Sequence, residues 1–210
     1  MAIRYPNGKV YSPKKIEVKE TGITQKKAPK TSFSNRGKSL EDDLNDTNSY
    51  YLAAGIANIH KKPVPIQIVK VEYPSRSAAV IREAYFRTAS TTDYNGVWNG
   101  HYIDFEAKET TNKTSFPLSN IHSHQIAHMK SVEVQKGIAF FIIRFTTLQR
   151  DFIVPFKVIE TSWEQQEQGG RKSIPLTIFE QQAIEVKQRL QPRIDYLAAV
   201  GQFIADEFSL

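Results

Sequence analysis

The dipeptide Asn99-Gly100 constrains the fold of this chain more than any other short stretch of it. It stands between two strand-like runs, and a type I′ hairpin turn needs positive φ at both central residues, which Asn and Gly adopt most readily. A turn at this position predicts an antiparallel hairpin in which Trp98 faces His101. The second Asn-Gly pair, Asn95-Gly96, is the alternative turn, and it would give a different register.

The first register brings polar side chains together. Continued along both strands, it places Asp93 opposite Glu106 and Thr91 opposite Lys108, on one face of an otherwise apolar ribbon. Directly opposed Cβ atoms lie about 4.5–5.5 Å apart, so the two carboxylates can share a cation that removes their mutual repulsion. Oxygen ligands favour Mg²⁺ or Mn²⁺, and Lys108 could offset charge on a phosphoryl group. Alternatively, this face is solvent-exposed, and Lys108 pairs with Glu106 or Asp104.

Composition indicates one soluble, cytoplasmic domain. The chain has 210 residues, enough for one hydrophobic core. It contains no cysteine, which excludes disulfides and thiolate metal sites and suits a reducing compartment. The N-terminus lacks the apolar stretch of a signal peptide. The longest apolar run, "IAFFII" at 138–143, is too short to cross a bilayer, so no membrane association is expected.

The basic charge is concentrated at the N-terminus. The net charge is +6, but residues 1–38 carry ten basic and two acidic side chains, which is +8 and leaves −2 for residues 39–210. Residues 1–33 are rich in Lys, Pro, Thr and Ser, so we expect a flexible basic arm. Such an arm suits phosphate contacts through counterion release. The alternative is a solvated tail without a partner.

The remaining patterns predict a single α/β domain over residues 34–210, with a mixed central sheet flanked by helices. A helix begins after Ser39, with Asp42 completing a capping box, and ends at Gly55. Its apolar stripe is Leu40, Leu44, Thr47 and Tyr51. Further expected elements in the first half are a strand at 64–74 and a strand or short helix at 78–88. They are followed by a helix at 117–137, a strand covered on both faces at 138–145 and its antiparallel neighbour at 150–156. A helix at 158–168 ends at Gly169-Gly170, a basic loop occupies 171–175, and the remainder has a weaker helical pattern.

Three histidines suggest a metal site of a different kind. His124 and His128 are spaced i,i+4 on one helix, with His122 close by. However, no Glu follows as in H-E-x-x-H, and no third ligand has suitable spacing. Contacts to phosphates or simple surface exposure are favoured over zinc binding.

The acid pair, the E-x-K spacing and an acid on the preceding helix resemble the catalytic core of the restriction-endonuclease-like nuclease superfamily. Longer stretches resemble the RecU-type Holliday junction resolvases of Gram-positive bacteria, from about residue 33 to about residue 196. They include "TTDYNG" at 91–96 and "HQIAHM" at 124–129. The others lie at 35–45, 59–69, 76–86, 102–118, 170–174 and 193–196.

This resemblance implies a function. RecU-type enzymes are homodimeric, Mg²⁺-dependent endonucleases, for which Mn²⁺ is an alternative cofactor, and they nick opposed strands of four-way DNA junctions during recombinational repair. By position, the metal-site residues are Thr91, Asp93, Glu106 and Gln125. Lys108 matches the residue that stabilises the transition state, and Glu41 matches the acid on the helix. A recombinase and a branch-migration helicase are further partners, at the nucleoid in the cytoplasm.

The resemblance also implies where DNA is contacted. Residues 64–86 would form a projecting stalk that enters the open centre of the junction, and the basic arm would add contacts. The candidate DNA-binding residues are Arg36, Lys61, Lys62, Arg76, Arg82, Arg87, Arg171 and Lys172. For those beside the stalk, the alternative is a solvated sheet edge protected by charge.

Two other functions remain open. One is a non-catalytic junction-binding or strand-annealing recombination factor of the same fold. The complete set of Asp93, Glu106 and Lys108 argues against it, because a binding module does not need opposed acids on a face that meets phosphates. The other is a sequence-specific nuclease of linear duplex DNA, against which the stalk argues.

Overall fold

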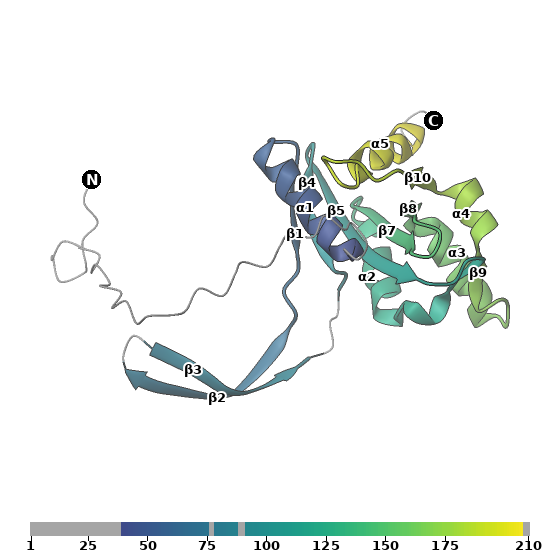
Figure 1. Ribbon diagram of the computed structural model, residues 1–210. Coiled ribbons are helices and arrows are strands. Elements are labelled where there is room, and N and C mark those ends of the chain that lie inside the picture. The colour runs from purple at the N-terminus through teal and green to yellow at the C-terminus, as the bar shows by residue number, and fades with distance from the viewer. Residues whose placement is uncertain (1–38, 76–77, 88–90, 208–210) are drawn as a thin grey trace, which may run out of the picture. The chain divides into compact units, whose positions relative to one another are not determined.

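The computed structural model describes residues 39–75, 78–87 and 91–207. The predicted arm at 1–33, Arg36 and Arg76 therefore lie outside the described residues. Every helix and strand among the described residues belongs to residues 36–210, which form one compact unit around a six-stranded sheet (Figure 1). In sheet order, its strands are β1 (Asn58–Lys61), β4 (Tyr94–Trp98), β5 (His101–Thr110), β7 (Ile138–Phe145), β8 (Arg150–Pro155) and β10 (Ile184–Val186).

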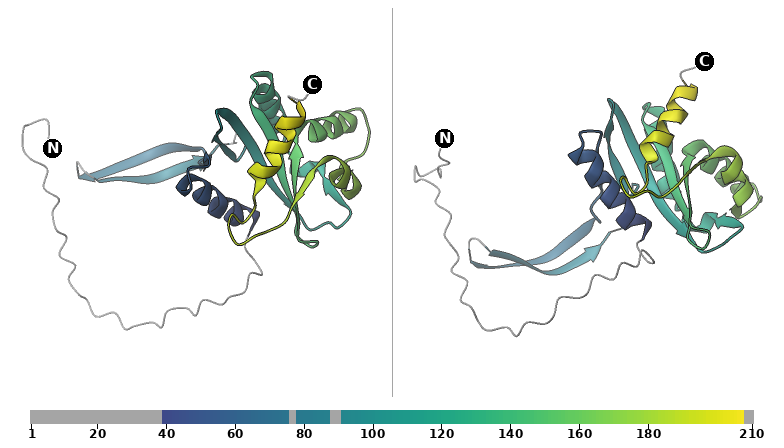
Figure 2. Two further views of the ribbon diagram at one scale, coloured as in Figure 1. Left: turned by 90° about the horizontal axis from the view of Figure 1, so that it is seen from above. Right: turned by 45° about the horizontal axis from the view of Figure 1, so that its top comes forward.

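The predicted mixed sheet flanked by helices is confirmed. β5 and β7 are parallel, and every other neighbouring pair in this sheet is antiparallel. One face of the sheet is covered by α1 (Leu40–Ala53) and α5 (Tyr196–Glu207), the other by α2 (Ser123–Val134), α3 (Phe156–Glu167) and α4 (Leu176–Gln182) (Figure 2). Each face therefore has its own hydrophobic core.

Strand β7 separates the two cores. Its side chains alternate between them, with Phe140 and Ile142 in one core and Phe141 and Ile143 in the other. All four are fully buried. The continuous apolar run predicted a strand covered on both faces, and this is confirmed. The crossover from β5 to β7 carries α2, which places that helix over the hairpin strand β5.

Helix α1 begins as its sequence predicts. Ser39 is the N-cap, and it forms a reciprocal capping box with Asp42. The predicted stripe is buried throughout, and Gly55 follows the helix with φ +67°, a conformation that favours glycine. A further contact was not predicted: the backbone N–H of Leu40 donates to the Glu109 carboxylate at 2.8 Å, which ties the helix start to β5.

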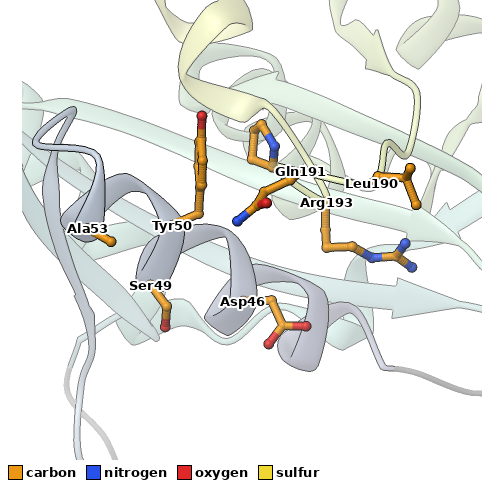
Figure 3. Close-up of a pocket in the computed structure, with 8 residues that line it drawn as sticks. Asp46, Ser49, Tyr50, Ala53, Leu190, Gln191 and Arg193 are labelled. Carbon is orange, nitrogen blue, oxygen red and sulfur yellow. The ribbon is translucent and has the colours of Figure 1, made fainter.

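The C-terminal segment packs across α1. The backbone N–H of Ile194 donates to the Thr47 hydroxyl at 3.1 Å, and the Tyr51 hydroxyl donates to Asp195 at 2.9 Å. A pocket of about 400 Å³ lies between α1 and residues 190–193, and Figure 3 shows Tyr50 of α1 beside this segment.

The weak helical pattern predicted for the C-terminal part of the chain resolves into α4, the short strand β10 and α5. β10 was missed because three residues are too few to display a period.

Strands β2 (Ile66–Ser75) and β3 (Ala78–Phe86) pair only with each other among the described residues. In the ambiguous segment 78–88, residues 78–86 form a strand rather than a helix. All nine residues of β3 are exposed, as are most of β2. The two ends of this hairpin are adjacent, because the backbone N–H of Arg87 donates to the Pro65 carbonyl at 2.9 Å.

The predicted helix at 117–137 begins later than expected. A 3₁₀ turn, Leu118–Asn120, comes first, Ile121 is extended, and His122 is the N-cap of α2. The two remaining strands, β6 (Ser115–Pro117) and β9 (Ser173–Pro175), form a small antiparallel pair. α3 agrees with its prediction and is followed by Gly169. Within the described ranges, no helix is both long and apolar enough to span a membrane.

Candidate catalytic and metal site

The turn between β4 and β5 forms at Asn99-Gly100. Trp98 pairs with His101, and both turn residues have positive φ, 47° and 82°. The alternative turn at Asn95-Gly96 is wrong for a physical reason. Gly96 lies inside β4, where a Cβ atom would stand only 2.2 Å from the carbonyl oxygen of Asn58 on β1. Glycine is needed there for close strand contact.

The ladder of β4 ends at Tyr94, one residue short of Asp93. Asp93 nevertheless lies beside Glu106, because its backbone N–H donates to the Glu106 carboxylate at 3.0 Å. The acid pair expected from the hairpin register is therefore brought together. Among the described residues, no contact joins Thr91 to Lys108, and the Thr91 hydroxyl lies 3.5 Å from the carbonyl of Thr92.

The polar face of β5 is buried, so the solvent-exposed alternative is wrong. Asp104 is 0% and Glu106 is 1% exposed. Helix α2 covers this face, and its Gln125 donates a side-chain hydrogen bond to Glu106. One part of the alternative does hold: the Lys108 ammonium pairs with Glu106 at 2.8 Å.

Glu106 has an unusual ionisation. Burial, followed by the negative charge of Asp93, raises the pKa of its carboxyl group to about 7, while Lys108 opposes this rise. Two carboxylates held this close are stabilised by a cation between them. The chemistry of the donors therefore fits a divalent metal, and oxygen ligands favour a hard ion.

Groups from α1, from the start of β4 and from β5 meet at one pocket of about 250 Å³. Glu41, Asp93 and Lys108 line it, together with Ser39, Leu40, Tyr94, Ala107 and Glu109. Glu106 does not line this pocket, but it contacts Asp93 and Lys108, which do. The helix acid, one hairpin acid and the lysine that the sequence singled out thus border a single cavity.

Gln125 holds Glu106 in place. Its amide nitrogen faces Glu106, while its amide oxygen accepts the backbone N–H of His122 at 2.9 Å. Exchanging the two amide atoms would bring two donors together at His122, so the hydrogen bonds fix this orientation. In this arrangement the Gln125 amide orients the Glu106 carboxylate. The amide would have to rotate before Gln125 could bind a metal ion.

Within the described residues, no three His, Asp or Glu side chains come together as a ready-made metal site. The three histidines do not form one group: His122 stacks on His124 with ring centroids 5.4 Å apart, while His128 lies 3.2 Å from Asp104. Burial, then His122 and Lys108, lowers the pKa of His124. A cation at the acid pair would have two protein carboxylates, and its other ligands would be water, hydroxyl or phosphate oxygen.

The candidate DNA-binding residues have varied surroundings. Lys61 pairs with Glu41, and Lys62 pairs with buried Asp104 at 2.8 Å. Their DNA contacts remain predictions, as do those of the other four described candidates. Arg82 pairs with Glu72, Arg87 donates to Gln67, Arg171 lines a pocket beside α3, and the Lys172 carbonyl accepts a hydrogen bond from Leu118.

Two neighbours of the site were not expected. Asp104 was considered only as a possible partner of Lys108, and its hydrogen bond from Thr92 joins residues that do not face each other in the hairpin register. Glu109 binds the start of α1, 69 positions away in the chain. Local periodicity carries no signal for either contact.

The fold and the acid–lysine set together are those of a nuclease-like α/β domain. The sequence comparisons identify the family: the model "RecU: Recombination protein U" matches residues 35–202, and the chain belongs to the RecU family.

Relatives from three genera match over nearly their whole length, and each is named Holliday junction resolvase RecU. The protein of Lactiplantibacillus plantarum is 55% identical, with 100% of both chains covered. That of Geobacillus kaustophilus is 53% identical over 95% of this chain and 96% of its own, and that of Staphylococcus carnosus is 51% identical over 98% of each. A solved structure of Archaeoglobus fulgidus Hjc, a Holliday junction resolvase, has a TM-score of 0.42 at 10% identity, covering 69% of this chain and 94% of that one.

Proposed function

We propose that this protein is a Mg²⁺-dependent endonuclease that resolves Holliday junctions by paired nicks in opposed strands during homologous recombination and DNA repair. Membership of the RecU family and the names of its relatives support this proposal. The observation that carries it is the pairing of Asp93 with Glu106 beside a pocket that Lys108 and Glu41 also border.

Asp93 and Glu106 would hold the cation, Mg²⁺ or Mn²⁺. The bound cation would supply activation of water and stabilisation of charge on the phosphate. Lys108 keeps its ammonium group at the pocket through its 2.8 Å contact with Glu106, so it can offset negative charge that develops on the phosphate there. Gln125 orients the Glu106 carboxylate through its side-chain hydrogen bond, and Glu41 lines the pocket together with Asp93.

Junction DNA would be bound by more than this site. We assign phosphate contacts to the basic arm at 1–33 and to the stalk at 64–86, which is part of the nuclease domain at 34–210. A homodimer would present two sites about a two-fold axis, which suits paired nicks in a two-fold symmetric substrate. The protein would act at the nucleoid with a recombinase and a branch-migration helicase.

The alternative is a non-catalytic factor that binds junctions or anneals strands. A binding factor does not need a carboxyl group whose pKa is raised by burial and by a second carboxylate beside it. The endonuclease proposal accounts for that pair, so it is preferred.

The deciding experiment uses an immobile four-way junction and a linear duplex of matched sequence, each with Mg²⁺ and with EDTA. Paired nicks at symmetric positions, in the junction alone and only with Mg²⁺, are the expected result. Cleavage of the duplex at an equal rate would favour the linear-duplex nuclease. Tight junction binding with no cleavage in Mg²⁺ or Mn²⁺ would favour the binding factor.

The variant Asp93→Asn tests the acid pair in the same assay. It removes a cation ligand without changing size, so we expect junction binding in EDTA to persist and nicking to be lost. Glu164→Gln is the matched control, because it neutralises an exposed carboxylate on α3. An Asp93→Asn protein that nicks at the rate of the wild type would exclude Asp93 from the metal site.

A further inference from the structure

Asp104 is a buried charge that the proposed reaction does not use. It is 0% exposed and lies on β5 two residues before Glu106, on the same face. One carboxylate oxygen accepts the Thr92 hydroxyl, and the other accepts the Lys62 ammonium at 2.8 Å and the Tyr102 hydroxyl at 2.7 Å. His128, named above, also lies against it. A carboxylate out of water is stable only with such partners, and Lys62 supplies the compensating positive charge.

The Lys62 side chain is held by the same group of residues as Asp104. Its side chain is 18% exposed, and its ammonium also donates to the Thr92 hydroxyl at 2.9 Å. An ammonium group with two acceptors in a largely buried site is poorly available to a DNA phosphate. This differs from the surroundings expected for the DNA contact that Lys62 was predicted to make.

Lys62 also holds the backbone next to the candidate metal site. Its own N–H donates to the Asp93 carbonyl at 2.7 Å. Since β4 begins only at Tyr94, Asp93 lies beyond the β4–β5 ladder. The Asp93 backbone is therefore fixed by two hydrogen bonds, one to Lys62 and one to Glu106.

We propose that Lys62 is a positioning residue of the metal site. Through Asp104 and Thr92 it anchors the segment that carries Asp93, so that the Asp93 carboxylate stays beside Glu106 at the spacing one cation requires. This inference rests on the proposed function, in which Asp93 and Glu106 hold the cation. It adds that the affinity for the cation depends on a lysine that touches neither the cation nor DNA.

The test variant is Lys62→Met, which keeps the length of the side chain and the backbone N–H but removes the charge. Titration calorimetry with Mn²⁺, on the protein without DNA, measures the affinity directly. We expect it to fall by about 10- to 100-fold, the usual effect of losing a partner behind a metal ligand. In nicking assays the Mg²⁺ concentration for half-maximal rate should rise, while the rate at saturating Mg²⁺ stays close to that of the wild type.

Junction binding in EDTA separates this role from a phosphate contact. A positioning residue predicts unchanged binding and an unchanged slope of log K against log[salt]. A phosphate contact predicts weaker binding and a slope smaller by about 0.9, with Mn²⁺ affinity unchanged. That second pattern would overturn the proposal.

Two further variants keep the test decisive. Lys62→Met combined with Asp104→Asn removes both buried charges, so it should fold even if the single variant does not, and it should retain the weakened Mn²⁺ binding. Lys130→Met is the matched control, a lysine paired with Glu160 away from the hairpin. It should leave Mn²⁺ affinity unchanged.

Asp93→Asn serves as the reference in the calorimetry. If wild type and Asp93→Asn bind Mn²⁺ equally, the cation is not at the acid pair and the proposed function fails. If Asp93→Asn loses binding while the double variant binds like the wild type, the metal site stands and only the positioning role of Lys62 is wrong.

Discussion

At the scale of single residues, the site contains an arrangement that is unfavourable without a cation. Glu106 is buried beside Asp93, and its carboxyl pKa is raised to about 7 from the ordinary value of 4.5. Perturbed carboxyl groups of this kind concentrate at functional sites, and the same burial and charge that destabilise the protein without a cation would favour the cation proposed to bind there. The metal-free protein should therefore gain stability when one of the acids is neutralised.

Asp93→Asn should stabilise the metal-free protein, and by more at high pH. The folded-state pKa of Glu106 is raised, so its contribution to stability is fully present below pH 4.5 and is lost as the pH rises to about 7. Removing the charge of Asp93 lowers that pKa and restores part of the loss, about 1 kcal/mol at a pH of about 8 and close to none at a pH of about 4.

Thermal unfolding in EDTA at both pH values measures this effect. Glu164→Gln is again the control, and it should give the same small change at each pH. A stability that falls in Asp93→Asn at the higher pH would contradict the explanation.

At the scale of elements, the hairpin uses two glycines in two ways. Gly100 has φ +82° and open space where a Cβ atom would lie, so its role is to form the turn. Gly96 lies within β4, where β1 passes too close for any side chain. The first glycine sets the register that brings Asp93 to Glu106, and the second allows the sheet to extend to β1 and Lys62.

Replacing these two glycines with alanine should therefore lower the free energy of unfolding by different amounts. Gly100→Ala strains only the turn and should lower the free energy of unfolding by about 1–2 kcal/mol, with nicking preserved. Gly96→Ala must separate β1 from β4, so we expect a loss of at least about 3 kcal/mol and of nicking with it. Urea unfolding of both variants measures the difference; equal losses would mean that β1 moves easily.

At the scale of the whole molecule, the described residues divide into a domain with two cores and a hairpin outside both. No residue of β2 or β3 belongs to either core, and their large apolar side chains, such as Tyr73, Tyr85 and Phe86, are exposed. A two-stranded hairpin alone is only marginally stable in water, so β2 and β3 contribute little to the stability of the domain. Exposed apolar surface of this extent favours a binding role, which agrees with the proposed stalk.

Replacing residues 66–86 with a short Gly-Ser turn should leave the domain folded. The ends of the hairpin are already joined by the hydrogen bond from Arg87 to Pro65. We expect the free energy of unfolding to change by less than about 1 kcal/mol, because no core contact is lost. Selectivity for the four-way junction over the duplex should disappear. A loss of several kcal/mol in urea unfolding would show that the hairpin packs on the domain.

The sequence by itself determined the features whose causes are local. The capping box and apolar stripe fixed α1, the run at 138–145 identified the central strand, and Asn-Gly turn chemistry set the hairpin register and so the acid pair. Each of these signals extends over a few residues, because helix and strand periods and turn dihedrals are properties of neighbouring residues. Stretches resembling the RecU family added Glu41 and Gln125, which no local pattern could assign.

Only the tertiary structure decided the surroundings of that acid pair. It placed α2 over the polar face of β5, turned the amide nitrogen of Gln125 toward Glu106, and buried Lys62 against Asp104. Lys62 and Asp104 are 42 positions apart, and Glu109 caps a helix 69 positions away. Such contacts depend on how distant elements pack, and a charged residue has the same local signal whether it meets a buried partner, a phosphate or water.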